Sequence, residues 1–354
     1  MKIIGVIVEY NPLHNGHIKH ISEIKKRYAD SLIIAVMSGN VVQRGEFAIY
    51  SKFDRAMEAI NHDIDIVVEI PSFFVLNHAN IFAKKAIEIL NDFFVEEIIF
   101  GSESNDINII KRKVEEIERI SDDDYVNEWK NNYSMPKTLE KLSNLDFKSN
   151  DILGICYISE GSKINKNIQF STVKRIRNEK YNSAFDLREK INQNIDISEY
   201  IPNKWIYQND IILQKNSDFE IFWKYDLYTK QTVEKEISFL KNQINTDNNF
   251  KITQISSENF TKAKLKRENM KFSLELEEEN YSKWRILSYS TKGKEYLSKK
   301  RNEINYSTKY LPIYKSELKI ARVLSLKYGE KSIINEINFN PEYANKLRKK
   351  RLNI

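Results

Sequence analysis

The stretch KIIGVIVEYNPLHNGH, Lys2 to His17, joins an apolar run to a short polar turn. Lys2 to Glu9 reads as a buried β-strand because it is almost continuously apolar and rich in β-branched residues. The residues from Gly16 to Tyr28 then show the spacing of a helix. A buried strand that leads through a turn into a helix is typical of the first unit of a parallel α/β sheet.

The same alternation continues through the first half of the chain, so the sequence predicts a Rossmann-like parallel sheet with helices on both faces. The expected strands are Ser31 to Met37, Ile64 to Ile70, Val95 to Phe100 and Ile168 to Val173. The expected helices are Ser51 to Asn61, Ala79 to Leu90, Asp151 to Glu160 and residues 184–192, with a charged helical stretch between Asn105 and Leu145. Ligands of such sheets bind beyond the carboxyl ends of the strands, so the polar loops there are the places to search for a site.

The turn after the first strand carries His14, Gly16 and His17, an HxGH pattern at a helix N-terminus. The helix dipole and free backbone N–H groups favour a phosphate at this position, and two imidazoles add further donors. Donors held in place stabilise the charge that gathers on a phosphorus during transfer, so we predict His14 and His17 as catalytic residues. Two surface histidines on a capped turn are the plain alternative. We expect no bound metal, because a third zinc ligand at suitable spacing is missing.

Composition points to an ordinary globular enzyme. Of the 354 residues, 41% are hydrophobic and 30% are charged, which supplies both a core and solubility. No apolar run approaches the length of a membrane helix and no signal peptide precedes the first strand, so we expect a cytoplasmic protein without a membrane partner. The single cysteine, Cys156, lies among apolar residues and is expected to be a packed thiol.

The positive charge gathers in the C-terminal part of the chain. Residues 251–354 hold 24 Lys and Arg against 12 Asp and Glu, a net +12, so residues 1–250 carry −6 of the total of +6. We therefore divide the chain into a catalytic domain, 1–195, and a mainly helical basic C-terminal region, 196–354, that binds nucleic acid. Phosphate contacts are expected from Lys262, Lys264, Lys292, Lys294, Lys299 and Lys300, with a further basic tail at Lys346 to Arg351. A solvated helical face is the alternative.

Several blocks together resemble the tRNA(Met) cytidine acetate ligase family of HxGH nucleotidyltransferases. They are GVIVEYNPLHNGH, MSGNVVQRGEFA (Met37 to Ala48), the Phe100 to Ser104 turn, SNDILG (Ser149 to Gly154), and Val173 to Arg175 followed by Tyr181 to Ala184. The likeness continues through Arg285 to Leu287, Lys292 to Lys294 and Leu311 to Ile313. The QRGE block, Gln43 to Glu46, combined with the FGSES turn is the most specific of these signals.

The resemblance implies an enzyme that activates acetate with ATP as acetyl-adenylate and acetylates N4 of the wobble cytidine of elongator tRNA(Met). The implied partners are ATP, acetate and this tRNA, and we expect Mg²⁺ to accompany ATP. The ATP site maps by resemblance onto Ile7, Val8, Glu9, Tyr10, Asn11, Pro12, Leu13, His14, Asn15, Gly16, His17, His20, Gly101, Asn150, Arg175 and Ile176. Ser183 and Arg188 are possible phosphate contacts, although Phe185 stands where relatives have a threonine and Phe47 where they prefer a proline.

Other functions are compatible with the motif alone. They are a small-molecule adenylyltransferase or pantothenate-synthetase-like ligase, a related tRNA cytidine modification with a different acyl or amine donor, and an RNA-binding protein without catalysis. The basic C-terminal region favours the tRNA enzyme, and the intact HxGH trio argues against loss of catalysis. The sequence leaves the oligomeric state open. It also leads us to expect that deletion from about residue 251 abolishes transfer to RNA but leaves acyl-adenylate formation intact.

Overall fold

A computed structural model of the protein describes most of the chain. The described residues are 1–121, 123–124, 138, 141–142, 149–175, 183–202, 219, 223, 227, 230, 234–246, 260–309, 314–328 and 336–338. The expected basic tail at 346–351 and Ile176 lie outside them. Among the described helices, none is long and apolar enough to cross a membrane.

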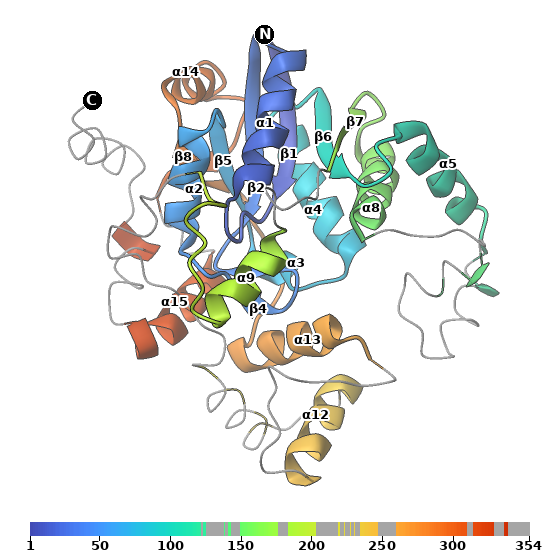
Figure 1. The fold of residues 1–354 in the computed structure, drawn as a ribbon, viewed down its shortest axis with the longest axis vertical. Coiled ribbons are helices and arrows are strands. Elements are labelled where there is room, and N and C mark those ends of the chain that lie inside the picture. Colours follow the sequence, from blue (N-terminus) through green and yellow to red (C-terminus); the bar gives the residue numbers. More distant parts are fainter. Residues whose placement is uncertain are drawn as a thin grey trace.

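A seven-stranded sheet forms the centre of the molecule (Figure 1). Its spatial order is β7-β6-β1-β2-β5-β8-β9. Neighbouring strands are parallel except for the antiparallel pair of β5 and β8. The strands are β1 (Lys2–Val8), β2 (Ser31–Ser38), β5 (Ile66–Ile70), β6 (Glu97–Ser102), β7 (Gln169–Lys174), β8 (Trp284–Tyr289) and β9 (Tyr306–Ser307). The predicted Rossmann-like α/β fold is confirmed.

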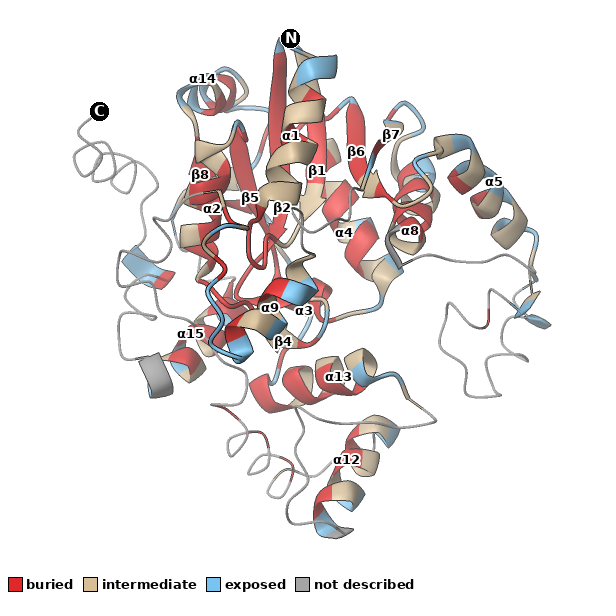
Figure 2. Cartoon of the chain, viewed as in Figure 1, coloured by how far each residue is buried: buried red, intermediate tan, exposed pale blue. Residues whose placement is uncertain are grey.

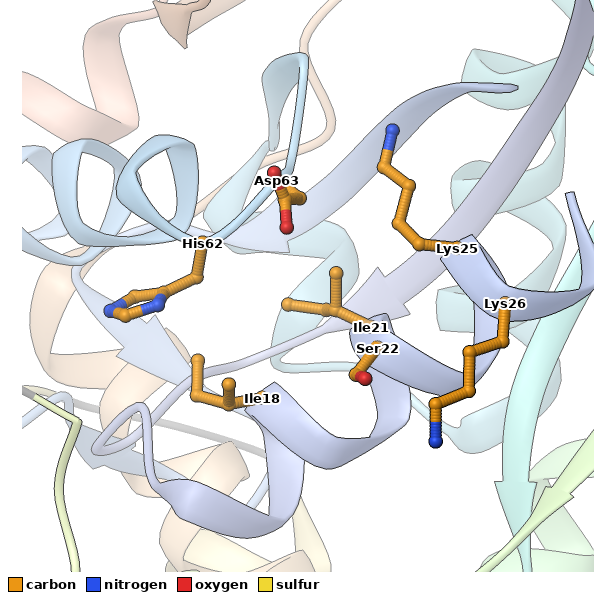
Figure 3. Close-up of a pocket in the computed structure, with 7 residues that line it drawn as sticks. All are labelled: Ile18, Ile21, Ser22, Lys25, Lys26, His62 and Asp63. Carbon is orange, nitrogen blue, oxygen red and sulfur yellow. The ribbon is translucent and has the colours of Figure 1, made fainter. Parts of the chain in front are cut away.

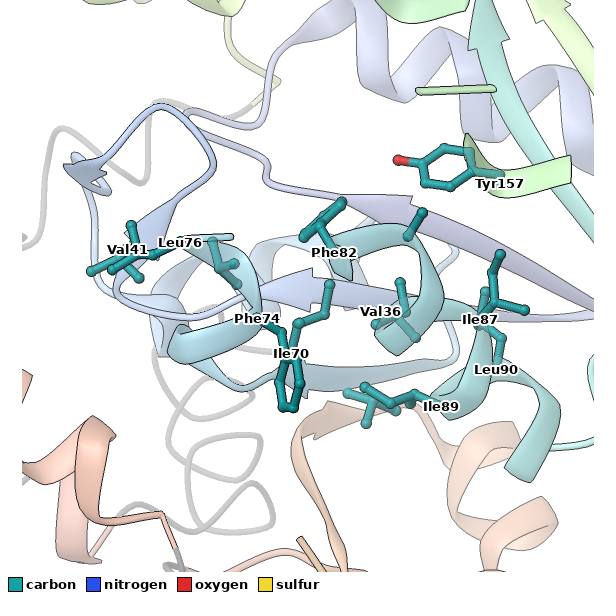
Figure 4. Packing of buried hydrophobic residues seen from close by; sticks show 14 of the residues in the cluster. Val36, Val41, Ile70, Phe74, Leu76, Phe82, Ile87, Ile89, Leu90 and Tyr157 are labelled. Carbon is teal, nitrogen blue, oxygen red and sulfur yellow. The ribbon is translucent and has the colours of Figure 1, made fainter. Parts of the chain in front are cut away.

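The two faces of the sheet are covered by different helices, and β2 shows how. Alternate residues of a strand point to opposite faces, so Ile33, Ala35 and Met37 pack with α1 (Asn15–Arg27) and α2 (Lys52–Asn61). The intervening Leu32, Ile34 and Val36 join the larger core under the helices of the other face, which are α4 (Ala79–Asp92), α5 (Ile107–Glu118) and α8 (Ser149–Ile164). Figure 2 shows the strands buried between these layers, and Figure 4 shows the packing of the larger core.

Shorter elements surround the carboxyl ends of the strands, and helices of the second half of the chain complete the fold. A two-stranded ribbon pairs β3 (Val41–Val42) with β4 (Glu46–Phe47), and α3 (Ser72–Val75) follows β5. The remaining helices are α9 (Ala184–Asn192), α12 (Lys235–Thr246), α13 (Lys262–Leu274), α14 (Thr291–Lys299) and α15 (Lys315–Tyr328).

The region expected to be mainly helical supplies two strands of the main sheet. All six residues of β8 are buried, and β8 pairs with β5 more than 200 residues earlier in the chain. The backbone N–H and the side-chain hydroxyl of Ser290 donate to Asp65 just before β5. This strand was missed because its six residues, WRILSY, neither alternate strictly between apolar and polar nor form a continuous apolar run, so no strand pattern marks them. The sheet therefore crosses the boundary placed at residue 195.

A buried cluster of charged side chains fastens this C-terminal part to the sheet. Lys52 Nζ lies 2.6 Å from Glu69 Oε1, 3.4 Å from Glu317 Oε2 and 3.0 Å from Glu336. Arg285 on β8 contacts Glu336 and lies 3.6 Å from Glu69. All five side chains are at most 2% exposed. Removal of one partner from such a cluster leaves a buried charge unpaired. The stability of the sheet therefore depends on the C-terminal segments that supply Arg285, Glu317 and Glu336.

Candidate active site

Arg55 fixes the backbone at the carboxyl ends of β1 and β2. Its side chain is 1% exposed, and its guanidinium donates to the carbonyl oxygens of Glu9, Ser38, Gly39 and Tyr50. A guanidinium with five donors can bond several carbonyl oxygens at once, and here it links the ends of β1 and β2 to the loop before α2. The turn from Glu9 to His14 is thereby held at one edge of the sheet. Sequence reasoning missed Arg55, because its helical spacing does not distinguish it from a surface arginine.

The two histidines of the motif stack at the start of α1. Their ring centroids are 3.7 Å apart with an interplanar angle of 24°. His14 Nδ1 accepts from the N–H of Gly16 at 3.0 Å, and His17 Nδ1 accepts from the N–H of His14 at 3.3 Å. A neutral imidazole has one donor and one acceptor nitrogen. Because both Nδ1 atoms are acceptors, the proton of each ring is on Nε2, and both Nε2–H groups serve as donors.

The site keeps its three histidines neutral. Burial, with Arg175 and Arg188 nearby, lowers the pKa of His14 to about 4. Burial and the neighbouring His14, His20 and Arg175 lower the pKa of His17 well below its ordinary value. Burial, with Arg27 and Arg175, lowers the pKa of His20 to about 4. At neutral pH these side chains therefore act as hydrogen-bond donors and not as cations.

Three buried nitrogen atoms around the turn have no hydrogen-bond partner among the residues that the structure describes. They are His14 Nε2, His20 Nε2 and Asn11 Nδ2. The other side-chain atom of Asn11, Oδ1, is satisfied by the N–H of Ile49 at 2.8 Å. Buried donors without partners carry a free-energy cost, and a bound acceptor removes it. Phosphate oxygens are such acceptors, so the turn is suited to a phosphorylated ligand.

The backbone at the N-terminus of α1 differs from the expectation of a free phosphate cradle. The N–H of Asn15 donates to Tyr200 O at 2.9 Å, and the N–H of Gly16 is used by His14 Nδ1. The N–H of His17 donates to His14 O at 2.8 Å. The donors available to a phosphate are therefore side chains, with the helix dipole as background. A Cβ on Gly16 would lie 2.8 Å from His14 Cε1, so this glycine makes room for the imidazole of the motif.

Two arginines approach the histidines from different elements. Arg175 follows β7 and lies against Gly101, where a Cβ would be 3.2 Å from Arg175 Cγ. Arg188 on α9 donates to Asn11 O at 2.8 Å, which fastens α9 to the turn. Ser183 instead caps α9: its hydroxyl donates to Asp186 Oδ2 at 2.6 Å and accepts from Asp186 N. The structure thus brings Arg188 to the site and gives Ser183 a helix-capping role.

The end of β6 is shaped by Asp151, which the sequence reading did not single out. Asp151 in the first turn of α8 is 2% exposed and accepts from Ser102 Oγ at 2.6 Å and from the N–H of Glu103 at 3.2 Å. These bonds fix the FGSES turn beside Gly101. Asn150, the expected ligand of this segment, has a described backbone in α8 but no described side chain. Its role stays a prediction.

The QRGE block serves as a docking surface for α13. Gly45 has φ +72° and a Cβ there would be 2.4 Å from Arg267 N, so only glycine fits this turn. Arg267 donates to Gln43 O at 3.0 Å, and Lys266 pairs with Glu46. The block therefore holds α13, which carries Lys262 and Lys264, at the carboxyl edge of the sheet.

The expected RNA-binding lysines fall into two groups at opposite edges. Lys262 is exposed on α13, and Lys264 pairs with Glu236 at 2.6 Å. The others lie on or just after α14 at the amino edge, where Lys292 donates to the carbonyl oxygen of Ser31, the first residue of β2, at 2.9 Å. Lys300 pairs with Glu303 at 2.7 Å, and Lys299 and Lys294 are exposed. Figure 1 shows α13 and α14 on opposite sides of the sheet. The structure does not bring the two groups together.

A separate pocket lies between α1 and the residues that follow α2 (Figure 3). It has a volume of about 300 Å³ and is lined by Ile18, Ile21, Ser22, Lys25, Lys26, His62 and Asp63. None of these residues belongs to the expected ATP site. Lys25 and Lys26 are already partnered, by Ser31 O and by Glu23. The pocket therefore adds nothing to the site at the turn.

Comparison with known proteins identifies the class first. A family model described as HIGH Nucleotidyl Transferase matches residues 1–348. The tRNA(Met) cytidine acetate ligase of Caldicellulosiruptor bescii is 30% identical over an alignment that covers 97% of this chain and 99% of that protein. That of Fusobacterium nucleatum is 32% identical, with coverages of 96% and 93%. The crystal structure of Thermotoga maritima TmcAL bound with alpha-thio ATP is similar with a TM-score of 0.83 and 25% identity, over 96% of this chain and 99% of that one.

The chain has the fold of the HIGH nucleotidyltransferases and carries their motif as His14 to His17. Within that class it belongs to the tRNA(Met) cytidine acetate ligase family. The resemblance seen in the sequence is confirmed.

Proposed function

We propose that this protein is an ATP-dependent ligase that activates acetate as acetyl-adenylate and acetylates N4 of the wobble cytidine of elongator tRNA(Met). The stacked pair of His14 and His17, in which each Nδ1 accepts a backbone N–H so that the ring proton is on Nε2, is the observation that carries the proposal. The full-length similarity to tRNA(Met) cytidine acetate ligases favours this activity over the small-molecule alternatives.

In the first step an acetate oxygen attacks the α-phosphorus of ATP, the bond to the β-phosphate oxygen breaks, and pyrophosphate leaves. Negative charge gathers on the α-phosphate oxygens as the phosphorus becomes five-coordinate. His14 and His17 are placed to donate to these oxygens, and Arg175 and Arg188 add positive charge nearby. The histidines need not move a proton in this step, because acetate is already an anion at neutral pH.

In the second step the N4 amine attacks the acetyl carbonyl carbon, AMP leaves, and N4 loses one proton. The step needs a cytidine lifted out of its stack and held beside the adenylate. We propose that residues 1–195 form the ATP-binding catalytic part and that basic residues of 196–354 neutralise the tRNA backbone. The proposed division is one of function only, because β8 and β9 of the second part join the same sheet as the strands of the first part.

We also propose that Mg²⁺ accompanies ATP. The support is the charge of the triphosphate, which favours a divalent ion that bridges phosphate oxygens. Among the residues that the structure describes, no group of three or more His, Cys, Asp or Glu is arranged to hold a metal. The ion would therefore be carried mainly by the phosphates and water. EDTA should stop acetate-dependent pyrophosphate release, and excess Mg²⁺ should restore it.

The test of the function is an acetylation assay with purified protein, ATP, labelled acetate and elongator tRNA(Met). Mass spectrometry of nuclease digests should find N4-acetylcytidine at the wobble position. His14→Ala and His17→Ala should each lower acetate-dependent pyrophosphate release by 100-fold or more, since loss of one transition-state donor costs about 10²–10³. Circular dichroism and thermal unfolding check that both variants fold.

His62→Ala is the matched control, because His62 is bonded to Glu58 at 3.1 Å and lines the separate pocket between α1 and the end of α2. It should keep wild-type activation. Wild-type rates of pyrophosphate release in both motif variants would refute the assignment of the catalytic site. Acetylation of a small amine but not of tRNA would favour the small-molecule alternative.

A further inference from the structure

Arg44 is an exposed arginine on a rigid support. Its neighbours in the turn between β3 and β4 are held on both sides: Gln43 N donates to Glu9 Oε1 at 2.7 Å, and Gln43 Nε2 donates to Asn77 O at 2.9 Å. Gly45 is packed against the backbone of α13, and Glu46 pairs with Lys266. The side chain of Arg44 itself is exposed. The turn therefore presents one guanidinium at a fixed place beside the catalytic turn.

The guanidinium of Arg44 lies over the ring of Phe185. The guanidinium carbon is 5.6 Å from the ring centroid, and Phe185 is 50% exposed although it is a large apolar side chain. Phe185 precedes Arg188 by three residues on α9, so the two side chains share one face of the helix. Arg188 in turn is bonded to Asn11 O beside His14. The exposed pair thus lies within one helical turn of a residue that contacts the HxGH turn.

The strand order separates this pair from Gly101 and Arg175 of the expected ATP site. β1, which leads into the HxGH turn, has β6 on one side and β2 on the other. Gly101 near the end of β6 and Arg175 directly after β7 lie on the first side. Arg44 follows β2 on the second side, and the turn that carries it is bonded to α13, the helix with Lys262. An acceptor that arrives on the β2 side therefore meets His14 and His17 from the flank opposite Gly101.

We propose that Phe185 and Arg44 form the platform on which the acceptor cytidine base stacks before acetyl transfer; this inference rests on the proposed function. A phenyl ring and a guanidinium both offer flat π faces, which are the usual partners of an unstacked base in RNA recognition. The nearby basic helix α13 supplies charge for the adjoining phosphates. Phe185 and Arg44 act here as positioning residues and take no part in adenylate formation.

The experiment compares Phe185→Ala, Phe185→Trp, Arg44→Ala and Arg44→Lys in both half-reactions. Phe185→Ala should lower kcat/KM for tRNA by about 10-fold, equivalent to about 1.4 kcal/mol. Phe185→Trp should retain most of the activity because it keeps an aromatic face. Arg44→Lys should resemble Arg44→Ala, since an ammonium has no flat face. The KM for ATP in acetate-dependent pyrophosphate release without tRNA should keep its wild-type value in all four.

A second readout follows the base directly. An anticodon stem-loop with a fluorescent cytidine analogue at the wobble position should change its emission on binding to the wild-type protein and not to Phe185→Ala. Phe94→Ala is the matched control: Phe94 is 41% exposed with Lys300 Nζ 4.5 Å from its ring centroid, but it lies at the amino edge of the sheet. It should leave kcat/KM and the fluorescence change as in wild type.

Three results would overturn the platform. They are unchanged transfer by Phe185→Ala, an equal loss in Phe94→Ala, and a raised KM for ATP in the absence of tRNA, which would place adenine on this pair instead. Failure of the wild-type protein to acetylate tRNA is a different result, which would refute the proposed function and not the choice of residues.

Discussion

Helices α13 and α14 are both rich in lysine, but they lie at opposite ends of the strands of the main sheet. α13 is fastened by Arg267 and Lys266 to the turn that follows β3, at the carboxyl edge of the sheet. α14 is fastened at the amino edge, where a Cβ on Gly293 would lie 2.0 Å from Asp65 O. Because both helices are basic, net charge alone does not distinguish them. The fold assigns only α13 to the edge where His14 and His17 lie.

This separation sets a length that an RNA must span to touch both helices. β1 has seven residues, and a strand rises about 3.3 Å per residue, so the two edges are roughly 23 Å apart. An extended polyanion such as a folded tRNA can reach across this distance, whereas a nucleotide cannot. The lysines of α14 therefore fit a role in holding a macromolecule and do not fit contact with ATP.

The largest effect is expected from deletion of the chain from about residue 251, which removes both α13 and α14. The sequence alone led us to expect that activation of acetate survives this deletion. The structure leads to the opposite expectation, because the deletion also removes β8 and leaves Lys52 and Glu69 buried without Arg285, Glu317 and Glu336. We expect no cooperative unfolding transition and no acetate-dependent pyrophosphate release.

Arg285→Met separates this effect from loss of the helices. It removes one member of the buried cluster in the full-length chain and should lower the free energy of unfolding by about 3–5 kcal/mol, as is usual for a broken buried pair. Urea unfolding followed by circular dichroism measures it. Lys283→Met, at an exposed position two residues earlier, is the control and should stay within about 0.5 kcal/mol of wild type. Equal stability of Arg285→Met and wild type would show that β8 is not fastened by this cluster.

The roles of α13 and α14 in tRNA binding can be separated by replacing lysines on one helix at a time. Replacement of Lys292, Lys294, Lys299 and Lys300 by Gln should weaken tRNA binding and reduce the slope of log affinity against log salt by about 3 to 4, if each lysine neutralises one phosphate. The acetylation rate at saturating tRNA should stay close to wild type, because these residues are far from His14. Filter binding over a salt series measures the slope.

The double variant Lys262→Gln, Lys264→Gln tests the other edge. It should reduce the salt slope by at most about 2 and should also slow acetyl transfer, since α13 lies at the catalytic edge. Wild-type affinity and slope in the α14 variant would show that its lysines are a solvated face. Equal effects of both variants on the rate at saturating tRNA would remove the distinction between the two edges.

The smallest expected effect is the pH dependence of the free energy of unfolding that the neutral side chains of His14 and His20 produce. Burial lowers the pKa of His14 and of His20 to about 4, so below pH 6.5 the unfolded chain binds protons that the folded chain does not. The free energy of unfolding should therefore fall by about 1 kcal/mol per histidine between pH 6.5 and 5.5, and continue to fall towards pH 4. Urea unfolding at several pH values measures this dependence.

The double variant His14→Asn, His20→Asn isolates the histidine contribution. Burial raises the pKa of Glu69, which works in the opposite direction over this range, but the effect cancels in the difference between variant and wild type. The variant should lose less stability than wild type as the pH falls. Parallel pH profiles would mean that the histidines are protonated as easily in the folded protein as in the unfolded chain.

The sequence predicted the main strands of the first half, β1, β2, β5, β6 and β7, because their patterns are local, and the helix at 184–192 was placed at the observed bounds. The two-residue strands β3 and β4 and the short helix α3 were not predicted, because elements of this length carry no periodic pattern. β8 was missed because what makes it a strand is its pairing with β5, a contact between segments far apart in the chain. The same limit applies to Lys52 and Arg285, whose burial depends on partners that no local pattern reveals.

The two histidines of the HxGH motif could be found in the sequence, but their protonation and tautomer could not. Their spacing and position after the first strand indicated phosphate chemistry. The choice of Nε2 as donor depends on the backbone N–H groups of His14 and Gly16, and the use of the helix N–H groups by the protein itself depends on Tyr200. Arg44 and Phe185 belong to different segments, so their contact appears only in the folded chain.

The late position of β8 in the chain has a consequence for synthesis on the ribosome. The nascent N-terminal part has all the strands from β1 to β7, but β5 remains an open edge with unpaired backbone groups until residues near 289 have emerged. During that interval the buried cluster around Lys52 and Glu69 also lacks Arg285. Domains are generally completed in the order of translation, yet this sheet is closed on one side by one of its last segments. Nascent chains halted before residue 284 should therefore be more sensitive to protease than chains halted after residue 338.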